Sequence, residues 1–529
     1  MKSIWLIILI LFPLISYGQK EFHIFPENDK INPGKPTGDG SISNPWDLQT
    51  ALNQKNSVIN GGDIVWLHGG IYNGRYISNL TSSIPNSYIT VSSFENDRVV
   101  LNGNIDSDNQ TVLQVKGRQV IYKDFDVTFL GEFVRDEKFK GYKAVSGISH
   151  TNGANCQFRN LRIHDVPGLG FGSWNSTDGT IIEYCMIYNN GFFYKNGKGG
   201  GEGMYVQNSS DTETRIIRNN IIFGNYYKAI EVWSANRDAN RQYVKNITIE
   251  SNVIFNSGLP ASQTVDNIII ASDDRNGVNV AKNIKVKDNI LYHNTDFAKN
   301  EVNGDAPSLT LGYYKKSPVE NITIDNNVII GRNNALRLLY IKSLAFNNNK
   351  VYTGYIQLNQ DVLNNLKPNN WNFKGNEYFT KNNTPYYLLS GKKFNLKNWK
   401  STFNIQEQSE FKNVKEFDLE NTLDITQNEY KPNQYRVTLF NKQGKDVTVD
   451  FSKYSAPIGT LYSIRDVEDY EKILKSGRVG NHKKIVFPMK LNNGNKNKTL
   501  DNFGVYIIEF SELDKEKKGF FERVFSWLF

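Results

Sequence analysis

A short motif that recurs through the middle of the chain constrains the fold more than any other feature. Each copy has two polar residues, a variable third position and then alternating apolar residues, as in RNNIIF from Arg218. Copies are separated by between 22 residues (Asn327 to Asn349) and 38 residues (Asn289 to Asn327). The third position is held by Leu161, Cys185, Asn220, Asn252, Asn289, Asn327, Asn349 and Asn376. Short β-patterned runs at this spacing predict a solenoid with loops inserted on one face.

The asparagines at the third position favour one kind of solenoid. Asparagine tolerates the left-handed backbone conformation that a sharp turn between two strands requires. When coils stack about 4.8 Å apart, side-chain amides at one position can hydrogen-bond from coil to coil. A helical solenoid would need apolar residues every three or four positions, which these segments lack. The repeat therefore predicts an all-β chain, with a right-handed, single-stranded parallel β-helix over residues 19–400.

A second short strand follows each copy of the motif, and its alternation predicts which side chains point inward. The predicted inward set is Met204, Val206, Ile230, Val232, Ile268, Ile270, Leu309, Leu311, Leu336 and Leu338. The predicted outward set, which we call the outward stripe, is Glu202, Tyr205, Gln207, Lys228, Glu231, Trp233, Thr310 and Arg337. The stripe crosses adjacent coils, so its side chains are expected to share one surface.

Three segments near the start of the chain carry a family resemblance. They are GDGSISNPWDLQTAL (Gly38–Leu52), GDIVWLHGGIY (Gly62–Tyr72) and YITVSSFENDRVVLNG (Tyr88–Gly103). This succession resembles the opening of secreted β-helix proteins of the pectate-lyase-like superfamily, including the chondroitinase B and alginate lyase group. The resemblance covers residues 22–380 and implies a short helix over Trp46–Asn53 that caps the unpaired edge of the first coil. The catalytic Lys/Arg motif of the lyase group is not recognisable here.

The N-terminus predicts export. Lys2 precedes an apolar run from Ile4 to Ile15, and small residues at Ser16-Tyr17-Gly18 suit cleavage, so residues 1–18 read as a signal peptide. The run is too short to predict a stable membrane span. We therefore expect a secreted, periplasmic or cell-surface protein.

The C-terminal part predicts a second domain. After a linker over residues 401–425, short strands separated by turn signals predict a small β-sandwich over residues 426–511. The sandwich is interpreted either as a carbohydrate-binding or attachment module or, preferentially, as a cap on the C-terminal end of the solenoid. The basic and then apolar tail, residues 512–529, is expected to dock on the body or touch a membrane surface.

Composition narrows the function classes. A hydrophobic fraction of 39% fits a folded protein, and the formal net charge of +8 fits either attraction to an anionic polymer or a lysine-rich soluble surface. No basic cluster interleaved with aromatic residues and no zinc-finger spacing occurs, so nucleic acid is not an expected partner. Cys156 and Cys185 differ in coil position, which predicts two buried, unpaired thiols. The expected partner is a polysaccharide and the expected state a monomer.

The outward stripe combines carboxylates, cations and aromatic rings that can stack on sugars. The longest inserted loops, expected to wall it, are residues 192–201, 234–243, 256–266 and 295–307. The candidate catalytic residues are Glu202, Tyr205, Lys228, Glu231 and Arg237. The candidate substrate-binding residues are Trp174, Gln207, Trp233, Arg241 and Arg275.

Elimination is one reaction that fits this set. A lyase removes the proton beside a uronate carboxyl group and needs a base, a neutralising cation or Ca²⁺, and a proton donor. Tyr205 or Lys228 is the candidate base, and Glu202 with Glu231 can hold Ca²⁺ through oxygen ligands. The candidate neutralising cations are Arg237, Arg241 and Arg275.

Hydrolysis and simple binding are the alternatives. A glycoside hydrolase needs two carboxylic acids, for which Glu202 and Glu231 on adjacent coils are the candidates. His164 and Asp165 follow a repeat strand and are interpreted as a turn-capping pair. The basic net charge favours a lyase that acts on a uronic-acid or sulfated polysaccharide, with a hydrolase or a non-catalytic carbohydrate-binding protein as alternatives.

Overall fold

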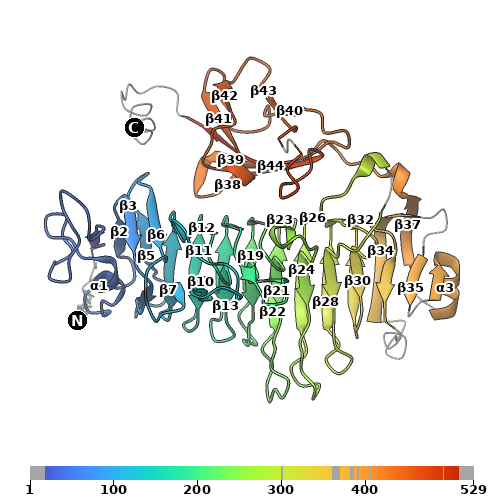
Figure 1. Cartoon of the computed structure of the whole chain (residues 1–529), viewed down its shortest axis with the longest axis horizontal. Helices are drawn as coiled ribbons and strands as arrows, with labels where there is room; N and C mark the ends of the chain where they lie inside the picture. The colour runs from blue at the N-terminus through green and yellow to red at the C-terminus, as the bar shows by residue number, and fades with distance from the viewer. Residues whose placement is uncertain are drawn as a thin grey trace, which may run out of the picture.

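The computed structural model describes residues 18–299, 302–359, 370–381, 386–389, 392–403, 407–491 and 494–511 (Figure 1). The predicted signal peptide, Gly18 excepted, and the predicted tail lie outside the described residues. Within those ranges, no helix has the length and apolar character needed to cross a bilayer.

Three rows of parallel strands wind into one solenoid, and each coil between the first and the last contributes to all three rows. The first row is β1 (Glu21–Ile24), β2 (Ile64–Leu67), β5 (Ile89–Ser93), β8 (Val120–Lys123), β11 (Gln157–Arg159), β14 (Ile181–Glu183), β19 (Arg215–Arg218), β22 (Lys245–Glu250), β25 (Lys282–Lys287), β28 (Glu320–Asp325), β31 (Leu344–Asn347), β34 (Trp371–Thr380) and β37 (Glu407–Asn413). The second row is β3 (Gly70–Asn73), β6 (Val99–Asn102), β9 (Asp126–Thr128), β12 (Arg162–His164), β15 (Met186–Tyr188), β20 (Ile221–Phe223), β23 (Val253–Phe255), β26 (Ile290–Tyr292), β29 (Val328–Ile330), β32 (Lys350–Tyr352) and the end of β34. This arrangement is the predicted parallel β-helix.

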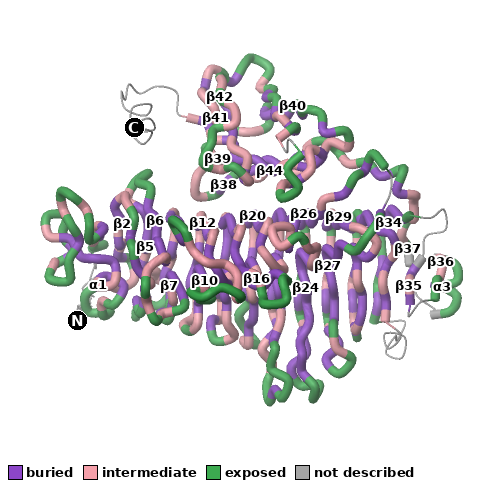
Figure 2. The backbone as a smooth tube through the Cα atoms, viewed as in Figure 1, coloured by how far each residue is buried: buried purple, intermediate pink, exposed green. Residues whose placement is uncertain are grey.

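The third row forms a separate sheet and carries the outward stripe. Its strands are β4 (Tyr76–Ser78), β7 (Thr111–Val115), β10 (Ser146–His150), β13 (Phe171–Ser173), β18 (Met204–Val206), β21 (Ile230–Val232), β24 (Ile268–Ile270), β27 (Leu309–Leu311), β30 (Leu336–Leu338), β33 (Ile356–Leu358) and β35 (Tyr386–Leu389). The strands are short and mostly buried, whereas the tips of the loops that extend beyond them are exposed (Figure 2). These loops flank the third row and define the walls of any site on it.

The asparagine ladder lies at the turn between the first and second rows. From Asn220 to Asn376 each ladder amide donates to the next one, with Nδ2 to Oδ1 distances of 2.9–3.1 Å. The predicted coil-to-coil hydrogen bonding is therefore confirmed. The left-handed conformation belongs to the residue before each ladder position, for example Asn219 (φ 57°) and Ser251 (φ 55°). The prediction that the ladder residue itself turns left-handed is wrong, because its amide must point inward to meet its neighbour.

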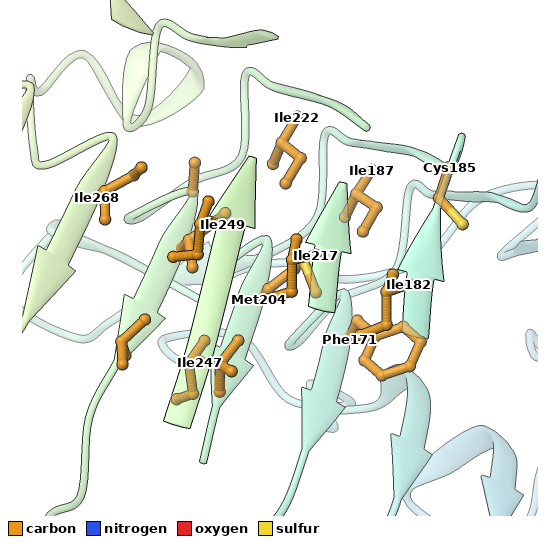
Figure 3. Close-up of a cluster of buried hydrophobic side chains, with 14 of the residues drawn as sticks. Phe171, Ile182, Cys185, Ile187, Met204, Ile217, Ile222, Ile247, Ile249 and Ile268 are labelled. Atoms are coloured by element: carbon orange, nitrogen blue, oxygen red, sulfur yellow. The ribbon is translucent and has the colours of Figure 1, made fainter. Parts of the chain in front are cut away.

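Aliphatic side chains fill the interior of the solenoid. All ten residues of the predicted inward set have at most 1% exposure. Figure 3 shows Ile187 and Ile222 of the second row, Ile217 of the first row and Met204 of the third row in one interior cluster. Cys156 and Cys185 are buried, unpaired thiols, as predicted.

Each end of the solenoid is covered by a short helix. At the start, α1 (Leu48–Leu52) buries Leu48, Ala51 and Leu52, and Asp47 caps it by accepting from the Thr50 backbone N–H. At the other end, α3 (Leu396–Phe403) follows β36 (Lys392–Asn395) and stacks Trp399 on Tyr387 at 4.3 Å. Because β37 still pairs in parallel with β34, the solenoid extends past its predicted end at residue 400.

The C-terminal domain is a two-sheet β-sandwich. Its five-stranded sheet has the order β38 (Thr422–Asn428), β39 (Lys431–Phe440), β44 (Phe503–Phe510), β41 (Leu461–Asp466) and β42 (Lys475–Arg478). Its second sheet pairs β40 (Val447–Asp450) with β43 (Lys484–Phe487). Side chains from both sheets share one core, and the first strand begins a few residues before the predicted boundary at 426.

The sandwich packs along the side of the solenoid, over the second row (Figure 1). Phe503 stacks on Tyr292 at 4.2 Å, and the Tyr430 hydroxyl donates to the buried carboxylate of Glu183 at 2.7 Å. The expectation that this domain caps the C-terminal end is wrong, because α3 occupies that end and the middle coils present an apolar face. The third row stays uncovered by this domain.

Candidate active site

A pocket of about 630 Å³ opens over the third row. Tyr205, Glu231, Ile269, Thr310 and Arg337 lie opposite one another on successive strands, and all of them except the fully buried Thr310 line the pocket. The lining residues are Tyr205, Tyr227, Lys228, Glu231, Trp233, Ala235, Thr264, Val265, Asp266, Ile269, Asp305, Pro307, Tyr313, Tyr314, Asn334 and Arg337. Three of the predicted walls, residues 234–243, 256–266 and 295–307, therefore contribute residues to the pocket.

Two carboxyl groups and one ammonium group gather at the edge of the pocket, where Glu231 and Lys228 line it and Glu202 lies outside the lining. Glu231 projects from the middle of β21 and is 6% exposed. Lys228, just before β21, places its Nζ 2.5 Å from Glu231 Oε1. Glu202 comes from the preceding coil, and its carboxyl group lies within interaction range of Glu231. The sequence-predicted Glu202, Lys228 and Glu231 are thus brought together.

The two glutamates differ in their surroundings. Burial and the neighbouring negative charge of Glu231 raise the pKa of Glu202 to about 8, so its carboxyl group is protonated at neutral pH. Burial opposes the charge on Lys228, but Glu231 outweighs it and raises the pKa of Lys228. Lys228 therefore stays an ammonium group, which suits it to balance Glu231 and not to act as the predicted base.

Glu202 reaches this position through a glycine-rich turn. A two-stranded hairpin, β16 (Phe192–Phe193) and β17 (Gly199–Gly200), leads into Gly201, whose φ of 87° is unfavourable for other residues. Next to Glu202, a Cβ on Gly203 would lie 2.7 Å from the Ala229 carbonyl oxygen of the following coil. Both glycines therefore let the chain approach β21 closely enough for Glu202 to touch Glu231.

Aromatic rings flank the carboxyl pair on both sides. Tyr205 lies opposite Glu231, and burial followed by the Glu231 charge raises the pKa of its phenol, so the hydroxyl stays protonated. Trp174 lies 5.3 Å from Tyr205 and is held by a 2.9 Å bond to Ser149. On the other side, Trp233 meets Tyr313 and Tyr314 edge-on at 5.7 and 6.0 Å.

The predicted arginines lie outside the pocket lining. Arg237 and Arg275 both pair with Asp273, and Arg275 also stacks on Tyr314 at 4.0 Å. Arg241 is exposed and stacks on Tyr243. These residues sit on loops, where strand alternation gives no information about direction. The structure therefore separates Arg237 and Arg241 from the carboxyl pair, and it places Arg275 behind an aromatic wall.

The remaining predicted residues have ordinary structural partners. Gln207 donates to the Trp233 carbonyl oxygen at 3.1 Å, which ties two adjacent coils together. His164 Nδ1 lies 2.6 Å from Asp165, in keeping with a turn pair away from the third row. Among the residues that the structure describes, no group of three or more His, Cys, Asp or Glu side chains is placed to hold a metal ion. Ca²⁺ at Glu202 and Glu231 stays a prediction, and Lys228 already supplies positive charge there.

Sequence reasoning missed a second ion pair in the pocket. Both oxygens of Asp266 accept from Arg337 Nη2 at 2.8 Å, across 71 residues of sequence. Arg337 was placed on the outward stripe, but nothing in the pattern connected it with Asp266. The available signal was the position of Asp266 just before strand NIIIA, which corresponds to Lys228 just before AIEVW.

Comparison with known proteins adds to the description of the fold. No protein-family model matches the sequence, and no curated protein matches it. Among solved structures, the chain is similar to pectate lyase Pel9A, with a TM-score of 0.40, 14% identity and coverage of 71% of this chain and 79% of that one. It is also similar to an alginate lyase from Paenibacillus sp. str. FPU-7, with a TM-score of 0.35, 17% identity and coverage of 59% and 90%.

A third similar structure is the GH136 lacto-N-biosidase from Eubacterium ramulus, with a TM-score of 0.44, 11% identity and coverage of 74% of this chain and 68% of that one. The chain is a parallel β-helix protein. At these identities the likeness concerns the fold alone, and the reaction has to be argued from the pocket.

Proposed function

We propose that this chain is a glycoside hydrolase that cleaves a polysaccharide or oligosaccharide in the pocket over β18, β21 and β24. The observation that carries the proposal is the contact between Glu202 and Glu231, with the Lys228 ammonium 2.5 Å from the second carboxylate. The protonated carboxyl group of Glu202 and the carboxyl group of Glu231, which pairs with Lys228, are the acid and the nucleophile or base that glycoside hydrolysis requires. The aromatic rings beside them are suited to stack on sugar rings.

The pair supports a double-displacement reaction. Retaining hydrolases hold their carboxyl groups about 5–5.5 Å apart, whereas inverting ones separate them by about 6.5–9.5 Å to admit a water molecule. The interaction between Glu202 and Glu231 leaves no gap for a water molecule between them, which favours the retaining arrangement. When substrate enters, its glycosidic oxygen replaces Glu231 as the acceptor of the Glu202 proton. Glu202 then protonates the leaving oxygen while Glu231 bonds to the anomeric carbon.

The second half of the reaction releases the sugar. Glu202, now a carboxylate, takes a proton from water, and the resulting hydroxide displaces Glu231 from the anomeric carbon. Lys228 balances the charge of Glu231 before and after this step. The cycle restores the proton on Glu202 and leaves one new hydroxyl group on each product.

Elimination, which the basic net charge favoured, has less support in the pocket. A uronate carboxylate needs an unengaged cation, but Lys228 lies against Glu231 and Arg337 against Asp266. Arg237 and Arg275 are both engaged by Asp273. Asp305 also lines the pocket, so acidic side chains outnumber basic side chains in the lining. The proposed substrate is therefore built from uncharged sugars at the cleaved position.

The test is a panel of neutral and uronate-containing polysaccharides, with products followed in two ways. New reducing ends without the ultraviolet absorbance of an unsaturated uronate are expected, and the first-formed anomer should match the substrate. Glu231→Gln and Glu202→Gln should each lower the rate by at least about 100-fold. Glu320→Gln, at an exposed ion pair with Lys342 on the first row, should leave it unchanged.

Other outcomes would replace the proposal. Unsaturated products would identify a lyase, and binding of a polymer without any product would identify a carbohydrate-binding protein. Full activity in both glutamine variants would move the reaction centre to another surface.

A further inference from the structure

Asp266 and Arg337 form a rigid donor and acceptor unit in the pocket wall. Arg337 Nη2 lies 2.8 Å from both oxygens of Asp266, and Arg337 Nε donates to Thr310 Oγ1 at 2.7 Å. The Thr310 hydroxyl in turn donates to Asp266. Thr310 and Asp266 are buried, so the three side chains hold one another in a single geometry.

Part of this unit remains available to a ligand. Among the residues that the structure describes, no hydrogen bond or ion pair is made by Nη1 of Arg337, which lines the pocket. Within the described part of the chain, Asp266 Oδ2 accepts a hydrogen bond from Arg337 alone, which leaves capacity for a second donor. A donor and an acceptor therefore lie side by side on the same wall.

Asp266 lies one coil away from the carboxyl pair, and Arg337 reaches it from β30, two coils further along the third row. Asp266 immediately precedes β24, which pairs with β21, and neighbouring strands are about 4.8 Å apart. On the same coil as Asp266, Ile269 lies opposite Glu231 and contributes an apolar residue to the pocket lining. A sugar ring over Ile269, with its anomeric carbon at Glu231, would direct its far hydroxyl groups toward Asp266 and Arg337.

We propose that the Asp266–Arg337 pair binds two adjacent hydroxyl groups of an uncharged sugar ring seated over Ile269, and thereby selects the sugar that enters the pocket. This inference rests on the proposed function for the orientation of the ring. One hydroxyl donates to Asp266 Oδ2 and its neighbour accepts from Arg337 Nη1. A sugar in which one of these hydroxyls is missing or inverted leaves a polar group of the protein unpaired, which is the strongest basis for discrimination between similar ligands.

Binding is measured without turnover, in the full chain carrying Glu231→Gln. The probes are the methyl glycosides of glucose, galactose, mannose and xylose with their single-deoxy derivatives, titrated by calorimetry. One configuration should bind best, and removal of either of two adjacent hydroxyls should weaken it. Arg337→Met and Asp266→Asn should each weaken the preferred sugar by about 10- to 100-fold and abolish the preference. Lys342→Met, at the exposed pair with Glu320, should change nothing.

Arg337→Lys keeps the charge but loses the two-nitrogen fork, and it serves as the variant least disturbing to folding. It should lose the preference while retaining the unfolding temperature of the parent. A preference that survives in Arg337→Lys and Asp266→Asn would overturn the inference, as would the absence of any hydroxyl dependence in the parent. A separate outcome is a chain that cleaves no glycoside and still binds sugars in a hydroxyl-dependent way that these variants lose. That result would overturn the proposed function alone.

Discussion

At the residue scale, the protonation state of Glu202 can be tested apart from catalysis. Because the pKa of Glu202 is raised from 4.5 to about 8, the folded chain holds a proton there that the unfolded chain releases. Stability from this group is present below about pH 4.5 and is lost as pH rises toward 8. Glu202→Gln is neutral at every pH. Its unfolding temperature should therefore rise relative to that of the parent as the pH increases from about 4.5 to about 8.

Thermal unfolding of both proteins across that range measures the difference. Glu320→Gln, at an exposed carboxylate, supplies the control curve and should run parallel to the parent. A constant gap between Glu202→Gln and the parent would contradict a raised pKa in the folded state.

The direction in which a side chain points was predictable on regular strands, where inward and outward residues alternate, but not on loops. Tyr205 and Glu231 project from regular strands, so the period of two fixed their outward direction and their register. Arg237 and Arg275 lie on long loops that follow strands. Their ion pairs with Asp273 are set by the loop conformation, which strand alternation does not predict. The bond between Asp266 and Arg337 spans three coils, and single-sequence reasoning has no measure of such a distance.

At the element scale, the asparagine ladder makes a direct prediction about stability. Asn289 is buried, donates to Asn327 and the Ile249 carbonyl oxygen, and accepts from the side chain of Asn252. Asn289→Ala removes these bonds and leaves the neighbouring amides unpaired, which should cost about 2–4 kcal/mol. Equilibrium denaturation measures the loss, and Asn372→Ala at an exposed strand position is the control. Equal stability of the two variants would show that the ladder contributes little.

At the scale of the whole molecule, the docking of the sandwich was the least predictable feature. The five strand segments and the turn signals identified the domain, but its position depends on which surface of the solenoid is apolar. Tyr188, Phe223, Phe255 and Tyr292 form an outward aromatic stack on the second row, and Phe503 of the sandwich completes it. A stack of outward aromatic residues on adjacent coils is a surface that needs a cover, and this signal was present in the repeat itself.

Phe503→Ala tests whether the sandwich stabilises the middle coils. The ring is buried between Tyr292 and Phe255, so its loss should cost about 3–5 kcal/mol and expose the second row. Hydrogen exchange should accelerate in β23 and β26 beneath the ring but not in β21 or β24 on the third row. Because the proposed active site lies on the third row, activity well below the unfolding temperature should stay near that of the parent. Ile458→Ala, at a residue that is 53% exposed on the sandwich, is the control. Unchanged exchange in β23 and β26 would mean that the solenoid is stable without its lateral domain.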